Sequence, residues 1–326
     1  MNVLISGASP DSVNNNATLR GYVANGFKGL PGVTSVQACS LESTATLARS
    51  THPDLIVVFG SCMPSVCHYL DLKQVALDTG ACVAFWLHDD PYEFDYSQKI
   101  IPLADIVFSN DRWSSTHYDH PNVHHLPLAA DLDAHFQEPG QTKSRDVFFC
   151  GVGFANRIQL LRDCASSLRG FKVEVLGAEW PDDLPFADNR RIPNTDLPKL
   201  HATSLVTLNM GRRFDLANER FKLDASTPGP RTFEAAAAGT VQCMFVEGFE
   251  IDDYYSEQNG EILLFDSPVE LRRHIEMLRD DAKRATDIAL AAQQRTRRDH
   301  TYRNRAETIL SLVALTVAHQ ARSVPD

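Results

Sequence analysis

Residues 226–246 read Ser-Thr-Pro-Gly-Pro-Arg-Thr-Phe-Glu-Ala-Ala-Ala-Ala-Gly-Thr-Val-Gln-Cys-Met-Phe-Val. Pro230 suits the first position of a helix, because its missing N–H would have no partner there. The sequence therefore predicts a short helix from Pro230 to Ala238, with Gly239 as its stop. The apolar run from Val241 to Val246 predicts a buried strand after it. This helix-to-strand unit is the centre from which the rest of the chain is read.

Arg231 and Glu234 are three residues apart, so they lie on one face of this helix near its start. Free N–H groups and the positive end of the helix dipole favour a phosphate at that point. Arg231 can bind phosphate oxygens as a planar fork, and Glu234 can accept hydrogen bonds from sugar hydroxyls. The alternative is an ordinary short helix with an exposed ion pair, which contributes little.

The composition is that of a globular protein with an acidic surface. The chain has 326 residues, enough for two α/β domains with their own cores. It carries 31 Lys and Arg against 42 Asp and Glu, a net charge of −11, so a nucleic-acid partner is unlikely. Seven cysteines without a CxxC pair indicate reduced thiols.

The sequence also bears on location. The N-terminus leads straight into a strand at Val3 to Ser6, without a basic region and an apolar run, so we expect no signal peptide. No apolar run reaches the roughly 18 residues that a transmembrane helix needs. The predicted location is cytoplasmic.

Strand and helix patterns alternate along the chain, and a polar stretch with a Pro-Gly pair interrupts them at residues 131–145. Such a stretch is typical of a domain boundary. The pattern predicts an α/β protein with a domain at residues 1–138, a second β/α domain at 139–300 and a final helical segment at 301–326.

The best N-terminal candidates follow the apolar run Val83 to Leu87, which predicts a buried strand. His88, Asp89 and Asp90 stand at its carboxyl end, where open α/β sheets bind ligands. His88 and Asp89 are therefore catalytic candidates, and the neighbouring carboxylates can set the tautomer and pKa of the histidine. The alternative is a polar loop in which Asp89 or Asp90 caps the next helix.

A metal site is not expected. Four histidines, at positions 117, 120, 124 and 125, crowd one region. Their spacing fits no firm zinc pattern and no cysteine joins them, so a solvated loop is favoured.

The second half supplies further binding candidates. Gly151 and Gly153 follow the strand Val147 to Cys150, and glycines there allow a ligand to approach the backbone. Arg157 falls in the first turns of the helix predicted at 155–168, within reach of a phosphate. The alternative is a plain strand-to-helix turn with a surface arginine. Asn209 lies at the exit of the strand that begins at Ser204.

A long basic loop is predicted at residues 210–229, with Arg212, Arg213, Arg220 and Lys222. Long loops without secondary structure are usually functional. The local positive charge on an acidic protein, leading to Arg231, indicates an anionic ligand.

Taken together, these stretches resemble the CgeB-like (spore maturation CgeB-type) glycosyltransferases, which are related to glycosyltransferase group 1. The Arg231-Thr-Phe-Glu234 helix with its alanines and Gly239 is the most specific part. The other matching stretches are 86–91, 106–111, 126–127, 146–151, 156–157, 208–209 and 300–306.

The resemblance implies the GT-B fold, in which two Rossmann-like parallel-sheet domains face each other across a cleft. The C-terminal domain would bind a nucleotide-sugar donor, the N-terminal domain would present the acceptor, and the last helix would cross back. Carried over, Arg231 and Glu234 match the donor-binding helix, with Glu234 near the ribose, and Gly151 and Arg157 lie near the diphosphate. Many related retaining enzymes carry a glutamate where this chain has Ser226.

The predicted reaction is transfer of a sugar from a nucleotide-diphosphate sugar to a hydroxyl-bearing acceptor, without a metal and with the nucleotide sugar as co-substrate. Arg231, Arg157 and Arg212 would stabilise the leaving diphosphate. His88 or Asp89 would face the reacting sugar from the other domain. Two alternatives stay open: a nucleotide-sugar epimerase of the same fold, and a binding protein without turnover.

Overall fold

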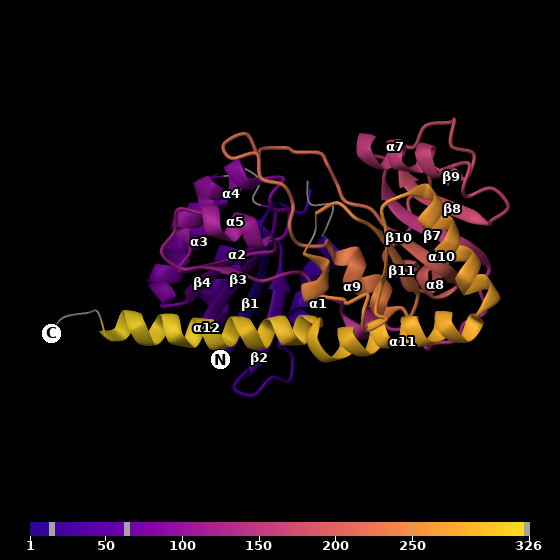
Figure 1. The fold of residues 1–326 in the computed structure, drawn as a ribbon. Coiled ribbons are helices and arrows are strands. Elements are labelled where there is room, and N and C mark those ends of the chain that lie inside the picture. The colour runs from indigo at the N-terminus through magenta and orange to yellow at the C-terminus, as the bar shows by residue number, and fades with distance from the viewer. Residues whose placement is uncertain (13–16, 62–65, 249, 323–326) are drawn as a thin grey trace. The chain divides into compact units, whose positions relative to one another are not determined.

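The computed structural model describes residues 1–12, 17–61, 66–248 and 250–322, and Figure 1 labels its elements. The chain forms two compact units. Unit 1 contains Met1–Leu128, Asp215–Thr227 and the segment from Tyr302 onward, and unit 2 contains Ala129–Phe214 and Pro228–Thr301. Each unit is built around a parallel sheet, as the alternating strand and helix patterns predicted.

The sheet of unit 1 has the order β2-β1-β3-β4-β5-β6, with every neighbouring pair parallel. The central strands β3 and β4 are buried along their whole length, because their apolar side chains cover both faces. The strands are β1 (Asn2–Gly7), β2 (Ser35–Cys39), β3 (Leu55–Gly60), β4 (Cys82–Leu87), β5 (Ile106–Ser109) and β6 (Val123–His125).

The final helix packs within unit 1, although it comes last in the sequence (yellow in Figure 1). The ring of Tyr302 lies 6.3 Å from that of Tyr22 and 6.0 Å from that of Trp86. A Cβ atom at Gly26 would stand 2.4 Å from the Tyr302 carbonyl oxygen, so this contact requires glycine. The helices of unit 1 are α1 (Ala17–Phe27), α2 (Leu41–Thr51), α3 (Val66–Thr79), α4 (Phe94–Ile100), α5 (Arg112–His117) and α12 (Tyr302–Arg322).

The sheet of unit 2 has the order β12-β11-β10-β7-β8-β9 and is also parallel throughout. Its core is formed by apolar side chains of the central strands β7, β10 and β11 together with the helices packed on them. The strands are β7 (Arg145–Val152), β8 (Val173–Ala178), β9 (Ala187–Asp188), β10 (Ser204–Asn209), β11 (Val241–Phe245) and β12 (Leu263–Phe265).

The short helix predicted from Pro230 to Ala238 is confirmed as α9 (Pro230–Ala237). Pro230 is its first residue, and Gly239 follows its end with a φ of 69°. The side chains from Thr232 to Ala237 are all buried, because the alanines let the helix pack closely against β10 and β11. The other helices of unit 2 are α6 (Leu132–His135), α7 (Ala155–Cys164), α8 (Leu197–Ala202), α10 (Pro268–Asp280) and α11 (Ala282–Asp299).

The structure contains elements, and places the ends of elements and units, that the sequence did not indicate. Edge strand β2 has mostly exposed side chains and α4 is short, so neither produces a clear hydrophobic period. The helix predicted at 155–168 ends as α7 at Cys164. The two units are defined by contacts between residues and not by composition. Unit 1 ends at Leu128 and unit 2 begins at Ala129, whereas the sequence predicted the domain boundary at residue 138. The segment 215–227 also belongs to unit 1.

Candidate functional site

The first turn of α9 carries a half-buried ion pair. Arg231 Nη1 donates to Glu234 Oε2, and Arg231 Nη2 donates to Asn194 Oδ1 at 3.3 Å. The Arg231 side chain is 39% exposed and that of Glu234 is 4% exposed. The alternative of a fully exposed ion pair is therefore wrong: the carboxylate is held inside unit 2 and the guanidinium remains accessible.

Two histidines that the sequence did not single out lie close to this pair. His135, on α6, places its Nε2 3.8 Å from Glu234 Oε1. His201, on α8, is fully buried; burial, followed by the charge of Arg231, lowers its pKa to about 3, so it is neutral. Its Nδ1 contacts Thr207 Oγ1 at 3.0 Å, and its Nε2 has no hydrogen-bond partner in the described part of the chain. The only sequence signal for either was a histidine in a short helical turn.

Asn209 lies at the carboxyl end of β10, as predicted. Its Nδ2 donates to Gln242 Oε1 on the neighbouring strand β11. This bond uses one of the two N–H donors of the amide, so the second N–H and the carbonyl oxygen of Asn209 are left for a ligand.

Gly151 and Gly153 lie where β7 leads into α7. A Cβ atom at Gly153 would stand 2.6 Å from the Glu179 carbonyl oxygen, and one at Gly151 would stand 3.0 Å from the ring of Phe149. Close packing therefore requires glycine at position 153 and leaves only tight space for a Cβ atom at position 151, which is a reason for glycine that the sequence did not show.

Arg157 is turned toward main-chain carbonyl groups. Its Nε donates to Gly211 at 3.0 Å, its Nη2 to Met210 at 3.1 Å and its Nη1 to Val152 at 3.1 Å. The guanidinium therefore joins the β7–α7 loop to the segment after β10. The predicted contact with a diphosphate stays a prediction.

The basic loop is coil between β10 and α9, as predicted, but its positively charged residues are divided between the two units. Arg212 and Arg213 belong to unit 2, whereas Arg220 and Lys222 belong to unit 1. Arg212 donates from Nε to the Phe214 carbonyl at 2.9 Å and lies over the ring of Phe154 at 5.5 Å. Its side chain is therefore held by the loop itself.

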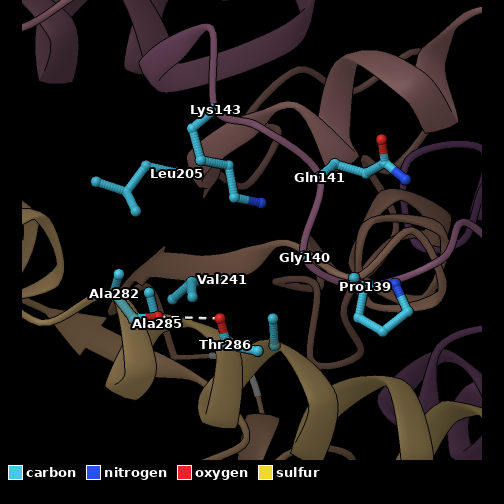
Figure 2. Close-up of a pocket in the computed structure, with 11 residues that line it drawn as sticks. Pro139, Gly140, Gln141, Lys143, Leu205, Val241, Ala282, Ala285 and Thr286 are labelled. Atoms are coloured by element: carbon cyan, nitrogen blue, oxygen red, sulfur yellow. Dashed lines mark hydrogen bonds between the residues drawn. The ribbon is translucent and has the colours of Figure 1, made fainter.

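Figure 2 shows a pocket in unit 2. It lies at the opposite end of β10 from Asn209. Leu205 and Val241 line it, and these residues lie near the amino ends of β10 and β11. Its volume of about 180 Å³ is small beside the roughly 300–1,000 Å³ of typical ligand pockets. Parallel sheets bind ligands at their carboxyl ends, so this pocket is not the candidate donor site.

In unit 1, His88 and Asp89 follow β4 as predicted. His88 is 6% exposed, its Nδ1 lies 3.4 Å from Asp89 Oδ2, and its ring packs edge-on against Phe59. Asp89 Oδ2 also accepts from the Ser61 hydroxyl at 2.7 Å. The residue at the N-cap of α4 is Glu93, so the alternative in which Asp89 or Asp90 caps this helix is wrong.

Asp90 is buried behind this pair. Its carboxylate accepts from the hydroxyls of Ser109 and Tyr118, both at 2.6 Å. Burial outweighs these hydrogen bonds, and the charges of Asp111 and Asp89 act in the same direction as burial, so the pKa of Asp90 rises to about 7.

Ser226, the position where related retaining enzymes carry a glutamate, is bound by Asp111. One oxygen of Asp111 accepts from the Ser226 N–H at 2.7 Å, the Ser226 hydroxyl at 2.9 Å and the Thr227 N–H at 3.1 Å. The other oxygen caps α5 through Ser114 N–H. Asp111 thus fixes the end of the segment 215–227 on unit 1.

The four crowded histidines make hydrogen-bond contacts near and far along the chain: His124, for example, binds Asn122, and His125 binds Thr227. Within the described ranges, no three His, Cys, Asp or Glu side chains are grouped so that they could hold a metal ion. Likewise, no helix in the described part of the chain is long and apolar enough to cross a membrane.

Comparison with known proteins now bears on this arrangement. Residues 157–311 match the model of a family described as glycosyl transferase-like. The chain is similar to Spore protein CgeB of Bacillus subtilis (strain 168), with 29% identity over 108 residues. That match spans 32% of this chain and 33% of CgeB, so it covers about a third of the length of this relative.

Solved structures share the fold. HepE from Anabaena, in complex with UDP and glucose, aligns over 96% of this chain and 99% of its own, with a TM-score of 0.64 and 12% identity. Sucrose-phosphate synthase from Thermosynechococcus elongatus aligns over 98% and 99%, with a TM-score of 0.63 and 10% identity. The chain therefore shares the GT-B fold of these solved structures, and its residues 157–311 resemble glycosyltransferases in sequence. The predicted resemblance to CgeB-like proteins is confirmed over the matched region.

Proposed function

We propose that this chain transfers a sugar from a nucleotide-diphosphate sugar to a hydroxyl-bearing acceptor without a metal. The observation that carries the proposal is the Arg231–Glu234 pair at the start of α9. It presents an accessible guanidinium and a buried carboxylate near a helix N-terminus. Related structures that contain UDP, or UDP-glucose, support a nucleotide-sugar donor.

In this proposal, unit 2 binds the donor. The N–H groups of the first turn of α9, whose positions the helix fixes, stabilise the diphosphate as it leaves, together with Arg231, which turns from Glu234 toward it. Glu234 accepts hydrogen bonds from the ribose. Gly151, Gly153 and Asn209 shape the site at the carboxyl ends of β7 and β10, and Arg212 adds positive charge. Arg157 holds the β7–α7 loop.

Unit 1 supplies the acid–base groups in this proposal. Nδ1 of His88 lies 3.4 Å from the carboxylate of Asp89, and in this proposal the carboxylate holds the proton on Nδ1 so that Nε2 acts as the basic nitrogen. Such a histidine can accept the proton of an acceptor hydroxyl if the reaction inverts. If the reaction retains configuration, His88 and Asp89 position the sugar instead.

The first test is nucleotide binding. A thermal-shift screen against UDP, GDP, dTDP, CDP and ADP identifies the base. Changing Arg231 to Ala should then weaken binding of the selected diphosphate by about 1.5–3 kcal/mol, the range for a hydrogen bond to a charged group. Arg273→Ala, which removes an exposed arginine of α10, is the matched control. Equal calorimetric affinity of Arg231→Ala and the native protein would remove Arg231 from the donor site.

A further inference from the structure

The inference concerns how the Glu234 carboxylate is held once a donor is bound. In the structure, Glu234 Oε2 accepts from Arg231, whose side chain is ten times more exposed than that of Glu234 (39% against 4%). A buried carboxylate is costly without polar partners. If Arg231 turns toward a diphosphate, as the proposed function requires, Glu234 needs another group to keep its orientation.

His135 is placed to be that group. Its side chain is 3% exposed, and its Nε2 faces Glu234 Oε1 at 3.8 Å. Its Nδ1 accepts the N–H of Asp131 at 3.0 Å. Because Nδ1 acts as an acceptor, the proton of the neutral ring lies on Nε2. The N–H group is therefore on the ring nitrogen that lies 3.8 Å from Glu234 Oε1, a separation that must shorten for a hydrogen bond to form.

The short helix α6 fixes this ring. A single turn is not stable by itself, but here the Asp131 side chain accepts from the N–H groups of Asp133 and Ala134 at 2.8 and 3.2 Å. The preceding Ala130 N–H donates to the His300 carbonyl at 3.0 Å, which ties the turn to the end of α11. The turn is therefore anchored on both sides of Asp131, and His135 has little freedom.

We propose that His135 is a positioning residue that orients the Glu234 carboxylate toward the ribose hydroxyls of the donor. It acts through Glu234 and does not itself touch the donor. The proposal rests on the proposed function, because it assigns Glu234 to the ribose.

The test separates ribose recognition from the rest of binding. UDP, or the diphosphate that the screen selects, is compared by calorimetry with its 2′,3′-dideoxy analogue. The ratio of the two affinities measures what the ribose hydroxyls contribute. His135→Phe removes the N–H group and His135→Gln keeps a donor near the position of Nε2. His135→Asn keeps a polar group near Nδ1 only. His274→Gln, at a buried histidine of α10 that binds the Leu264 carbonyl, is the matched control.

We expect the native protein to bind the diphosphate about tenfold or more tightly than its dideoxy analogue, as hydrogen bonds to a carboxylate imply. His135→Phe and His135→Asn should bring this ratio close to one, with the affinity for the dideoxy analogue unchanged. His135→Gln should keep most of the ratio, and His274→Gln should keep all of it. Agreement between the Phe and Asn variants also excludes a folding defect in one of them.

The outcomes that overturn the proposal are distinct from those that overturn the function. If Glu234→Ala abolishes the ratio while His135→Phe and His135→Asn keep it, His135 does not position Glu234, and the proposed function stands. The inference also fails if Phe, Asn and Gln variants lose affinity for both nucleotides equally, since that indicates a structural role. If Glu234→Ala keeps the ratio, or the native protein binds no diphosphate, the proposed donor site itself is wrong.

Discussion

At the residue scale, two buried carboxylates differ in their partners. Glu234 contacts a guanidinium and faces an imidazole N–H. The Asp90 carboxylate accepts from the neutral hydroxyls of Ser109 and Tyr118 and lies near the charges of Asp111 and Asp89. A cation favours the ionised form of a carboxyl group, whereas burial beside like charges favours the protonated form. Of these two buried carboxyl groups, that of Glu234 is thus suited to ligand binding and that of Asp90 to a pH response.

Asp90 should make the stability of the protein depend on pH. Its pKa is about 7 in the folded protein, against roughly 3.9 in an unfolded chain. The folded state therefore binds this proton more tightly, so the stabilisation is complete below about pH 4 and is lost as the pH rises through about 7. In Asp90→Asn, the free energy of unfolding should decrease less as the pH rises from about 4 to about 7. Denaturant titration at several pH values measures this dependence. Asp71→Asn, on the exposed part of α3, is the control; an unchanged slope in Asp90→Asn contradicts the assignment.

His88 and Asp89 should matter for turnover and not for nucleotide affinity. His88→Ala and Asp89→Ala should each lower turnover by a factor of about 100 or more, the lower end for acid–base groups. The calorimetric affinity for the diphosphate should barely change, because the proposed donor contacts come from unit 2. Turnover is followed as release of nucleoside diphosphate with the acceptor present. Near-normal rates in both variants would leave these residues as a polar loop.

At the element scale, the turns at the carboxyl ends of β7 and β8 depend on close contact between two backbones. Gly177 has a φ of 143°, and a Cβ atom there would stand 1.9 Å from the Gly151 carbonyl oxygen. The conformation and the space both demand glycine. Gly177 lies in β8 and pairs with Gly151 in β7, and Gly153 follows β7 in the loop that Arg157 joins to the exit of β10. The predicted donor-binding loop is therefore one packed assembly.

Gly177→Ala should consequently destabilise unit 2 by several kcal/mol, in the range that severe backbone strain and overpacking produce. Gly21→Ala is the matched control: Gly21 lies in α1 with nothing near its Cβ position, so alanine there should be neutral or stabilising. Thermal unfolding of the two variants measures the difference. A native-like melting temperature for Gly177→Ala would show that the β7 and β8 ends can separate without loss of stability.

At the scale of the whole molecule, the chain passes between its two units several times, and α12 returns to unit 1 through Tyr302. The division of labour that we propose places phosphate binding on basic groups of unit 2 and proton transfer on unit 1. Phosphate binding then uses positively charged and N–H groups, because Arg231 and the helix N–H groups stabilise the negative charge that develops on the leaving diphosphate.

This division predicts that turnover survives EDTA. Arginine and backbone N–H groups stabilise the leaving diphosphate in the proposal, so a divalent cation is not required. In the sequence the neighbouring carboxylates of Asp89 and Asp90 were the pair most suited to hold Mg²⁺ with substrate phosphates, but Asp90 is buried and accepts from Ser109 and Tyr118. Nucleoside diphosphate release is therefore measured after chelation and again after Mg²⁺ or Mn²⁺ is added. Loss of activity that either cation restores would overturn metal independence.

The sequence by itself determined the sheets and the central helix. Val83 to Leu87 and Leu55 to Phe59 are apolar on both faces, and such runs are stable only as interior parallel strands. Pro230 and Gly239 fix the limits of α9 through backbone conformations that few other residues favour. These are local effects, so a local pattern predicts them, and with them the positions of Arg231 and His88.

Only the tertiary structure decided which side chains meet. His135 lies beside Glu234, Arg157 donates to the carbonyls of Met210 and Gly211, and Asp111 binds Ser226. Each contact joins residues from different elements, and its geometry depends on how those elements pack rather than on propensity or period. A polar side chain in a loop looks the same in sequence whether it ends in water or in a buried network. For this reason the sequence could nominate Glu234, and the fold was needed to show what holds it.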